Sequence, residues 1–236
     1  MLRLDRDGER FVFENEWDLL IPYSVERYDG KEAEITVIPR ISRAVRAALR
    51  RLGDDLFSDT ALRQIWSLVS PHEAEWGYIG GKYRWKRTLI YRMPNGASPA
   101  APRREVRLLT EADEGINRTT YRIDESIRAG CLAVGAMENG QLVSVAVTHG
   151  NVADLPPNAV VELGIETTPD ARGRGYASSC LAYITAVLLD RGLIPEYRCT
   201  RSNRASSATA SGIGYRRVGE ALDLLMRRAP AKRTEQ

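Results

Sequence analysis

Two glycines, Gly173 and Gly175, stand between a strand-like and a helix-like segment, and both neighbours, Arg172 and Arg174, are cationic. A strand, a glycine-bearing turn and a helix N-terminus form an anion-binding cradle, because free backbone N–H groups and the positive end of the helix dipole face the same point. Glycine has no Cβ, so a phosphate can approach the backbone closely. The pattern predicts binding of a phosphate or pyrophosphate.

The flanking segments must position this turn. Residues 160–167 are short and rich in β-branched side chains, and Pro169 follows them, which predicts a strand. The next segment has apolar residues at helical spacing and ends at Gly192, which predicts a helix. The turn has neither Gly-x-Gly-x-x-Gly nor Gly-Lys-Ser/Thr, so a dinucleotide site and a P-loop are set aside. An ordinary strand-to-helix turn is the alternative.

Arg172, Gly175 and Ala177 resemble motif A of the GNAT superfamily of N-acetyltransferases, whose pattern is Arg/Gln-x-x-Gly-x-Gly/Ala. A second segment, Asn203-x-x-Ser206 followed by Gly-Ile-Gly-Tyr at 212–215, resembles the downstream Asn-bearing helix of that family. The resemblance covers about residues 104–227. It implies a GNAT-like acyltransferase fold, α+β or mixed α/β in class.

The resemblance also implies acetyl-CoA as the acyl donor, an amine as the acceptor and no metal. In this family the turn holds the pyrophosphate of coenzyme A, and the pantetheine arm runs along the motif strand. The two arginines of the turn would add charge, although they could equally be solvated. The residues expected to bind acetyl-CoA are Ile165, Glu166, Thr167, Arg172, Gly173, Arg174, Gly175, Tyr176, Ala177, Asn203 and Ser206.

Acyl transfer to an amine requires two proton movements. An amine like that of lysine, with a pKa of about 10.4, must first lose a proton, and the departing thiolate leaves more easily if it is protonated. Glu162 is the predicted general base, since relatives often place a carboxylate on this strand; a solvated or salt-bridged glutamate is the alternative. Many relatives carry a tyrosine where this chain has Ala210, so water or a nearby serine would have to protonate the thiolate. His149 is expected to be structural.

Composition sets further bounds. The chain has 236 residues, 43% of them hydrophobic and 28% charged, as in a soluble globular protein. A net charge of +3 does not call for a nucleic-acid partner. Nothing approaches the roughly 20 apolar residues of a membrane span, and the N-terminus is unlike a signal peptide, which predicts a cytoplasmic protein. The three cysteines, Cys131, Cys180 and Cys199, have no metal-ligand spacing and are expected to be buried thiols.

A stretch rich in proline, glycine and alanine at 94–103 predicts a linker. It would separate a small N-terminal accessory α+β domain at 1–93 from a catalytic domain at 104–227, with a charged tail at 228–236. In the first domain we expect strands at 10–13 and 33–38 and helices from Ser42 and Ser58. The first helix has a basic face, expected to be solvated, with a helix-turn-helix as the alternative; it contains Arg43, Arg46, Arg50 and Arg51.

The aromatic run at 76–85 is expected to be a hairpin that packs two tryptophan rings into the first domain, with a substrate-facing wall as the alternative. In the second domain we expect a helical stretch at 111–128, a helix from about 204, and a hairpin whose turn is Asn139-Gly140. Strands are expected at 106–109, 131–137, 142–149, 194–199 and 215–226.

The sequence thus predicts an N-acetyltransferase that moves an acetyl group from acetyl-CoA to an amine. A small amine, an amino acid and a protein lysine all stay open as acceptors, as do a longer acyl group and a homodimer. The first domain is expected to shape acceptor choice. The alternative is a catalytically idle CoA-binding module whose N-terminal domain carries a binding function.

Overall fold

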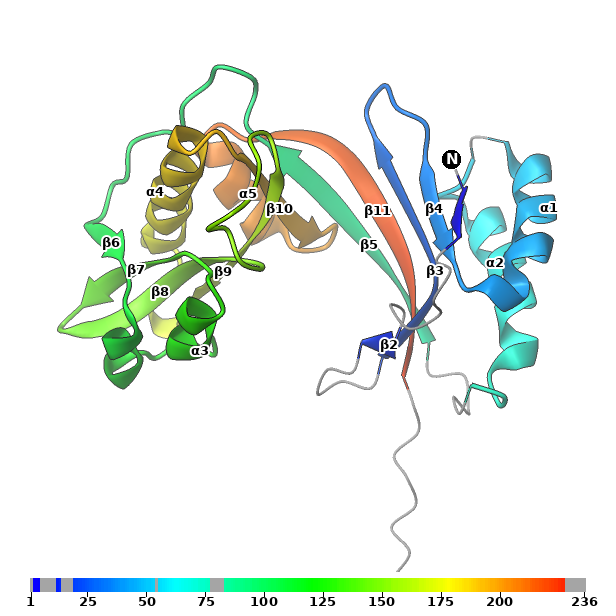
Figure 1. Cartoon of the computed structure of the whole chain (residues 1–236), viewed down its shortest axis with the longest axis horizontal. Coiled ribbons are helices and arrows are strands. Elements are labelled where there is room, and N and C mark those ends of the chain that lie inside the picture. The colour runs from blue at the N-terminus through cyan, green and yellow to red at the C-terminus, as the bar shows by residue number, and fades with distance from the viewer. Residues whose placement is uncertain (1, 5–11, 14–18, 54, 77–82, 228–236) are drawn as a thin grey trace, which may run out of the picture. The chain divides into compact units, whose positions relative to one another are not determined.

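The structure, a computed structural model, describes residues 2–4, 12–13, 19–53, 55–76 and 83–227 (Figure 1). Its class is mixed α/β, as the sequence predicts. The chain divides into two compact units, Met1–Thr88 with Gly219–Gln236, and Leu89–Val218. The boundaries fall inside strands β5 (Tyr83–Arg92) and β11 (Arg216–Arg227), so each of these strands contributes to both units.

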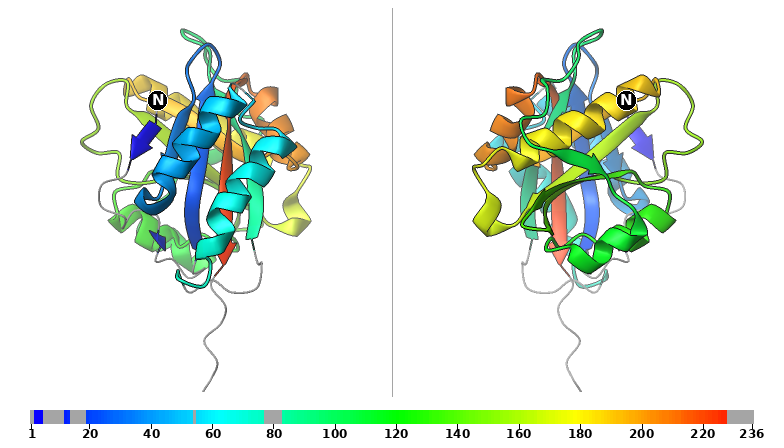
Figure 2. Two further views of the ribbon diagram at one scale, coloured as in Figure 1. Left: turned by 90° about the vertical axis from the view of Figure 1, so that its right-hand side faces the viewer. Right: turned by 90° about the vertical axis from the view of Figure 1, so that its left-hand side faces the viewer.

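The first unit is a sheet covered on one face by two helices, which lie side by side in front of the strands in Figure 2, left. The strand order is β1-β4-β3-β11-β5, and the short β2 pairs with β3. The elements not yet given bounds are β1 (Leu2–Leu4), β2 (Val12–Phe13), β3 (Leu19–Tyr28), β4 (Glu34–Val37), the 3-10 turns η2 (Pro39–Ile41) and η3 (Ser70–His72), and helices α1 (Ser42–Leu52) and α2 (Asp59–Val69).

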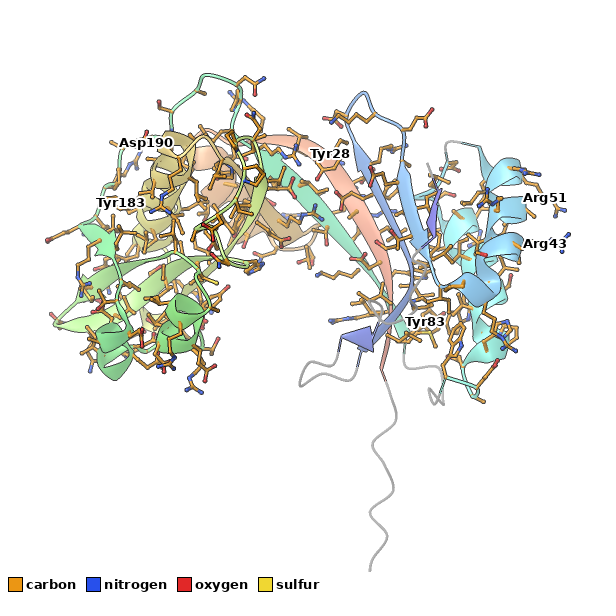
Figure 3. The ribbon with its side chains drawn as sticks, viewed as in Figure 1. Tyr28, Arg43, Arg51, Tyr83, Tyr183 and Asp190 are labelled. Atoms are coloured by element: carbon orange, nitrogen blue, oxygen red, sulfur yellow. The ribbon has the colours of Figure 1, made fainter. Side chains whose placement is uncertain are left out.

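Both predicted helices of this unit are confirmed. The Ser58 hydroxyl accepts a hydrogen bond from the Ala61 N–H at 3.1 Å and so caps α2. The apolar faces of the helices are buried in one core, to which Val45 and Ile65 contribute. The arginines of α1 are exposed, and Figure 3 shows Arg43 and Arg51 pointing away from the helix into solvent. The helix-turn-helix alternative for this basic face stays a hypothesis.

The expected strand at 33–38 is confirmed as β4, and Val12–Phe13 from the expected strand at 10–13 form β2. Strand β3 was not predicted. Trp76 and Trp85 pack against the core of this unit, as expected, whereas residues 77–82 of the aromatic run lie outside the described residues.

The second unit is a sheet in the order β5-β10-β9-β8-β7-β6. Its other elements are β6 (Val106–Leu108), η4 (Glu111–Ile116), α3 (Ile123–Arg128), β7 (Ala133–Glu138), β8 (Gln141–Thr148), β9 (Val160–Thr167), η5 (Pro169–Ala171), α4 (Tyr176–Asp190), β10 (Ile194–Thr200) and α5 (Arg204–Gly212). Helix α4 crosses the sheet in Figure 2, right.

Helix α4 is largely buried, because it carries apolar side chains that pack into the core. Leu181, Ile184 and Leu188 have no exposed surface and share one core with Val161 and Leu163 of β9. A separate core holds Ile123 of α3 together with apolar residues of β7 and β8. Asn139 and Gly140 both have positive φ, 50° and 75°, so the predicted hairpin turn between β7 and β8 is confirmed.

One predicted helix is wrong. The stretch at 111–128 is split into η4 and α3 by a loop at 117–122. Asn117 forms a β-bridge with Leu142, and its side-chain amide donates to the Tyr121 carbonyl at 2.6 Å. The Asn117 carboxamide oxygen also accepts from the Thr119 N–H at 2.9 Å. These bonds satisfy backbone groups that a helix would otherwise pair, so the loop replaces the helix.

The predicted linker at 94–103 lies in the second unit and is hydrogen bonded to it. The Ala100 N–H donates to the Ile213 carbonyl at 3.0 Å, and the Arg103 N–H donates to the Ser179 hydroxyl at 3.0 Å. Both contacts fix the segment beside helices α4 and α5. Whether residues 1–93 and 104–227 fold as separate domains stays a prediction.

Cys180 and Cys199 are buried, as expected, and Cys131 is half-buried. Burial raises the pKa of the Cys180 thiol to about 12, which keeps it protonated and unreactive. Within the described residues, no helix is long and apolar enough to cross a membrane.

Candidate active site

Strands β9 and β10 are paired only along their first halves. Parallel pairing runs from Val160 with Ile194 to Leu163 with Tyr197, although β9 continues to Thr167 and β10 to Thr200. The other edge of β9 is paired with β8 as far as Thr167. Among the residues that the structure describes, the β10-facing edge of β9 is therefore open from Gly164 onward, where a ligand can take the place of a strand.

A cavity of about 390 Å³ opens at this gap, between β9 and the first turns of α4 and α5. That volume is typical of a small-molecule site. Every residue predicted to bind acetyl-CoA lines the cavity except Arg174. The predicted residues in its wall are Ile165, Glu166, Thr167, Arg172, Gly173, Gly175, Tyr176, Ala177, Asn203 and Ser206; Ala171, Ser178, Ala205 and Thr209 were not predicted.

The start of α4 leaves backbone donors facing the cavity. Gly173 and Gly175 have φ of 73° and 84°, in the left-handed region where a Cβ is strained. The first helical hydrogen bond runs from the Ser179 N–H to the Gly175 carbonyl at 3.1 Å. The three amides before Ser179 therefore have no helical acceptor, and Gly175 has no side chain that could cap them. The dipole of α4 adds positive potential at the same place.

The two arginines of the turn have different roles. The Arg172 Nε donates to the Thr167 carbonyl at 3.2 Å, and this residue lines the cavity. Arg174 is instead ion-paired with Glu138, and its guanidinium lies over the Tyr176 ring at 5.3 Å. The side chain of Arg174 therefore fixes the turn to β7 and does not contribute to the wall of the cavity.

The first turn of α5 forms the opposite wall. Asn203 caps this helix, since its side-chain oxygen accepts from the Ser206 N–H at 3.1 Å. Burial raises the pKa of Tyr197, which is 3% exposed, and the neighbouring Ser206 side chain partly offsets that rise. Ala210 lies one turn further along and is fully buried. A tyrosine is therefore present next to this wall, but it comes from β10 and not from position 210.

Beyond the cavity, Glu162 belongs to a charged cluster on the face of the sheet opposite α4. Its carboxylate lies 3.5 Å from Nδ1 of His149 and 3.6 Å from Nε of Arg198. The Glu162 side chain is 41% exposed, and the His149 N–H donates to its backbone carbonyl at 2.8 Å. Arg198 also pairs with the buried Glu196 at 2.6 Å, and Arg92 pairs with Glu196 at 2.6 Å.

Tyr121, which sequence reasoning missed, reaches the same face from the 117–122 loop. A methyl group placed on Gly164 would collide with both the Tyr121 hydroxyl and Nε2 of His149, so these two groups lie next to each other over Gly164. Burial, with the nearby carboxylates of Glu166 and Glu162, raises the pKa of Tyr121 to about 12. The phenol is therefore protonated at neutral pH and can donate a hydrogen bond.

Glu166 holds this loop in place. Its Oε2 accepts from the Thr120 N–H at 3.0 Å and from the Thr120 hydroxyl at 2.6 Å. Arg118, also in the loop, pairs with Asp170 at 3.1 Å. The loop is thus tied both to β9 and to the segment before the glycine turn.

A second cavity of about 310 Å³ adjoins the first and shares Ser178 and Thr209 with it. Its wall is made largely of small residues from α4, α5 and the segment at 100–103, together with Arg103. Within the described part of the chain, no group of three or more metal-ligating side chains is clustered.

The sequence model of the GNAT acetyltransferase family matches residues 126–221, which include the residues that line the cavity, as well as His149 and Glu162. A search of curated proteins found no match. Among solved structures, a GNAT-family acetyltransferase from Colwellia psychrerythraea is 13% identical with a TM-score of 0.50, over 82% of this chain and 76% of that chain. At this identity the likeness concerns the fold alone.

Two further structures match less well. A GCN5-related N-acetyltransferase-like protein from Streptococcus suis is 20% identical with a TM-score of 0.49, over 70% of this chain and 69% of that chain. The aminoglycoside N-acetyltransferase AAC(6')-Iy, solved in complex with CoA, is 20% identical with a TM-score of 0.38, over 48% of this chain and 92% of that chain. For the first three structures found, this chain covers 66%, 69% and 56% of the solved chain.

Proposed function

We propose that the protein transfers an acetyl group from acetyl-CoA to an amine, because residues 126–221 match the sequence model of the GNAT acetyltransferase family. The acceptor class is left open between a small amine, an amino acid and a protein lysine. The observation that carries the proposal is the cavity at the β9–β10 gap, whose wall contains the open N-terminus of α4.

The donor would be held mainly by backbone groups. The pyrophosphate of coenzyme A suits the uncapped amides at the start of α4, where the helix dipole favours a negative charge. The pantetheine arm carries amide groups, which suit the open edge of β9 from Gly164 to Thr167. Asn203 and Ser206 would line the opposite side of the arm. With the cradle at the far end of β9, the thioester would lie near Gly164.

Glu162 would supply the base. The acceptor nitrogen must be unprotonated before it attacks the acetyl carbon, so a carboxylate beside the thioester removes its proton, directly or through a water. The position of Glu162, two residues before Gly164 on β9, supports this role. Its contacts with His149 and Arg198 hold the carboxylate without burying it, since the side chain is 41% exposed.

We further propose that the first unit shapes acceptor choice, because the donor cavity is lined wholly by residues of the second unit. A cytoplasmic location and a homodimer also stay proposals. Cell fractionation and light scattering on the purified protein are the respective tests.

Isothermal titration calorimetry of the full chain with acetyl-CoA tests the proposed function. We expect calorimetry to give a Kd for acetyl-CoA in the micromolar range or tighter. In a separate thiol assay, we expect the protein to release free CoA thiol from acetyl-CoA when a panel of primary amines is added. A protein that shows neither heat nor a thermal shift with excess acetyl-CoA would contradict the proposal. Binding without transfer to any amine would favour a catalytically idle CoA-binding module.

A further inference from the structure

The reaction leaves a proton requirement that Glu162 alone does not meet. When a neutral amine attacks, the C–N bond forms and the C–S bond breaks, and the electron pair of that bond goes to sulfur. The nitrogen loses one proton and the thiolate gains one. A proton donor beside the sulfur would help the thiolate to leave, and Ala210 offers none at the position where relatives carry a tyrosine.

We propose that Tyr121 donates this proton to the leaving thiolate and regains it from Glu162 through His149. This inference rests on the proposed acetyl transfer. The relay consists of three residues from separate parts of the chain: Tyr121 in the loop at 117–122, His149 directly after β8, and Glu162 on β9.

The contacts give the relay its order. Nδ1 of His149 lies 3.5 Å from the Glu162 carboxylate, and Nε2 of His149 lies beside the Tyr121 hydroxyl over Gly164. An imidazole accepts a proton on one nitrogen and releases one from the other, and histidine exchanges protons near neutral pH. Glu162 would take the proton of the amine, His149 would pass a proton on, and Tyr121 would deliver its own to sulfur. No proton is left over.

The position of Tyr121 matches the end of the donor site. Pairing between β9 and β10 ends at Leu163, so Gly164 is the first β9 residue of the gap. A pantetheine arm that starts at the glycine turn and follows β9 backwards along Thr167 and Ile165 ends at Gly164. The Tyr121 hydroxyl lies over that residue, where a Cβ would not fit. The glycine at 164 thus gives both the phenol and the imidazole room beside the thioester.

The loop at 117–122 is held in place by hydrogen bonds and an ion pair. Its backbone and side-chain bonds to Glu166, Leu142 and Asp170 fix it at several points. Nε2 of His149 lies next to the Tyr121 phenol over Gly164, and the charges of Glu166 and Glu162 on β9 and of Tyr197 on β10 are near enough to raise its pKa. Because its pKa is about 12, a free phenolate would be unfavourable, so loss of the phenol proton must be concerted with reprotonation from His149.

Tyr197 is the competing phenol. It lies where the two strands separate, but it is only 3% exposed, which leaves its hydroxyl little access to a ligand. It shares the core with Ala210 and Leu181, on the side of the sheet that α4 covers. Tyr121 lies on the same side as Glu162, so only Tyr121 completes a chain of proton carriers from that carboxylate.

The test compares wild type with Tyr121→Phe, which keeps the ring and removes only the hydroxyl. The ultraviolet absorbance of the thiolate reports the pKa of the thiol of bound CoA, and this measurement needs no acceptor. Without its hydrogen-bond donor the thiolate is less stable, so we expect Tyr121→Phe to raise this pKa by about 1, a tenfold change. Tyr183→Phe on α4, away from both cavities, is the matched control and should behave as wild type.

Kinetics supply the second readout, with acetyl-CoA and spermidine, lysine and kanamycin as probe acceptors. Tyr121→Phe should lower kcat about 100-fold while the Kd of CoA is unchanged. His149→Gln should also lower kcat, but it should leave the pKa of the bound thiol as in wild type, since His149 only returns the proton. An unchanged thiol pKa in Tyr121→Phe, or a loss of kcat in Tyr197→Phe but not in Tyr121→Phe, overturns the relay alone. Failure of wild type to bind CoA overturns the proposed function together with it.

Discussion

The two halves of strand β9 differ in what they present. From Gly164 to Thr167 the strand presents an open backbone edge, and the cavity beside it ends at a helix N-terminus whose donors are also backbone groups. At Glu162 the strand pairs with β10 on one edge and accepts a hydrogen bond from the His149 N–H on the other, and what it presents is a side chain, in contact with His149 and Arg198.

This difference suggests that the two halves of β9 serve two different functions, donor binding and proton transfer. Donor binding would depend on backbone conformation, which glycines set locally, and proton transfer would depend on side chains brought together from distant segments. If so, variants can damage either function while the other stays intact. The following variants test that separation.

Glu162→Gln should have the largest effect. A lost general base typically costs about 100- to 10,000-fold in rate, so kcat should fall by that range while the Kd of acetyl-CoA, measured by calorimetry, stays the same. The acidic limb of the pH–rate profile should disappear, because a glutamine has no carboxylate to protonate. A variant that keeps wild-type kcat across the pH range would exclude Glu162, and Glu166 would be the next carboxylate to test.

Gly175→Glu should damage donor binding, which Glu162→Gln leaves intact. The new side chain adds bulk, a negative charge and a strained positive φ at the mouth of the cradle, so CoA affinity should fall by at least about 100-fold. Gly192→Glu is the matched control, because Gly192 has a φ of 71° at the far end of α4 and a Cβ there would meet only open space. The control should lose some stability and keep its CoA affinity in calorimetry. Equal losses of affinity in both variants would show that strain alone is responsible.

Asp113→Asn, in η4 and outside the cavity, should destabilise the fold. A hydrogen bond with Arg107 lowers the pKa of Asp113 to about 2, and the Thr110 N–H donates to the same carboxylate at 2.8 Å. A carboxylate with a depressed pKa stabilises the fold above the pKa of the unfolded chain, near 4, and this contribution is lost as the pH falls towards 2.

The variant should therefore lower the free energy of unfolding by about 2 kcal/mol at pH 7, and its difference from wild type should vanish between about pH 4 and pH 2. Urea unfolding across that pH range measures it. Asp190→Asn, at the exposed end of α4 in Figure 3, is the control and should show little difference at any pH. A difference for Asp113→Asn that is constant with pH would mean that packing, and not charge, is involved.

Thr120→Val should have the smallest effect. The substitution removes one of the two hydrogen bonds to Glu166 and keeps the backbone bond. A hydrogen bond of this kind contributes about 1 kcal/mol, so we expect the loop to loosen and kcat to fall by up to about tenfold, with no change in CoA affinity. A fall in CoA affinity instead would show that Glu166 contributes to donor binding. Donor binding and proton transfer would then not be separate functions of different β9 residues.

The sequence predicted the residues that line the cavity better than those that gather around Glu162, because only the first set forms a local pattern. A glycine turn between a strand and a helix is a local pattern, and the residues assigned to it, except Arg174, line one cavity. Tyr121 and His149 meet over Gly164 only because a loop interrupts the predicted helix at 111–128. The signal for that loop was Asn117, whose side chain bonds to nearby backbone groups, and a helical reading of the segment ignores this competition.

Strand β11 lies between β3 and β5 in the first unit, although it begins only at the end of the second unit in sequence. On a ribosome, β3 and β5 emerge early, each with an unpaired edge, and both must wait for Gly219–Arg227 before their sheet can close. The second unit can assemble most of its sheet in that interval. During synthesis, the unit that starts first is therefore completed last. Until then the edges of β3 and β5 that β11 later covers are open to pairing with another strand.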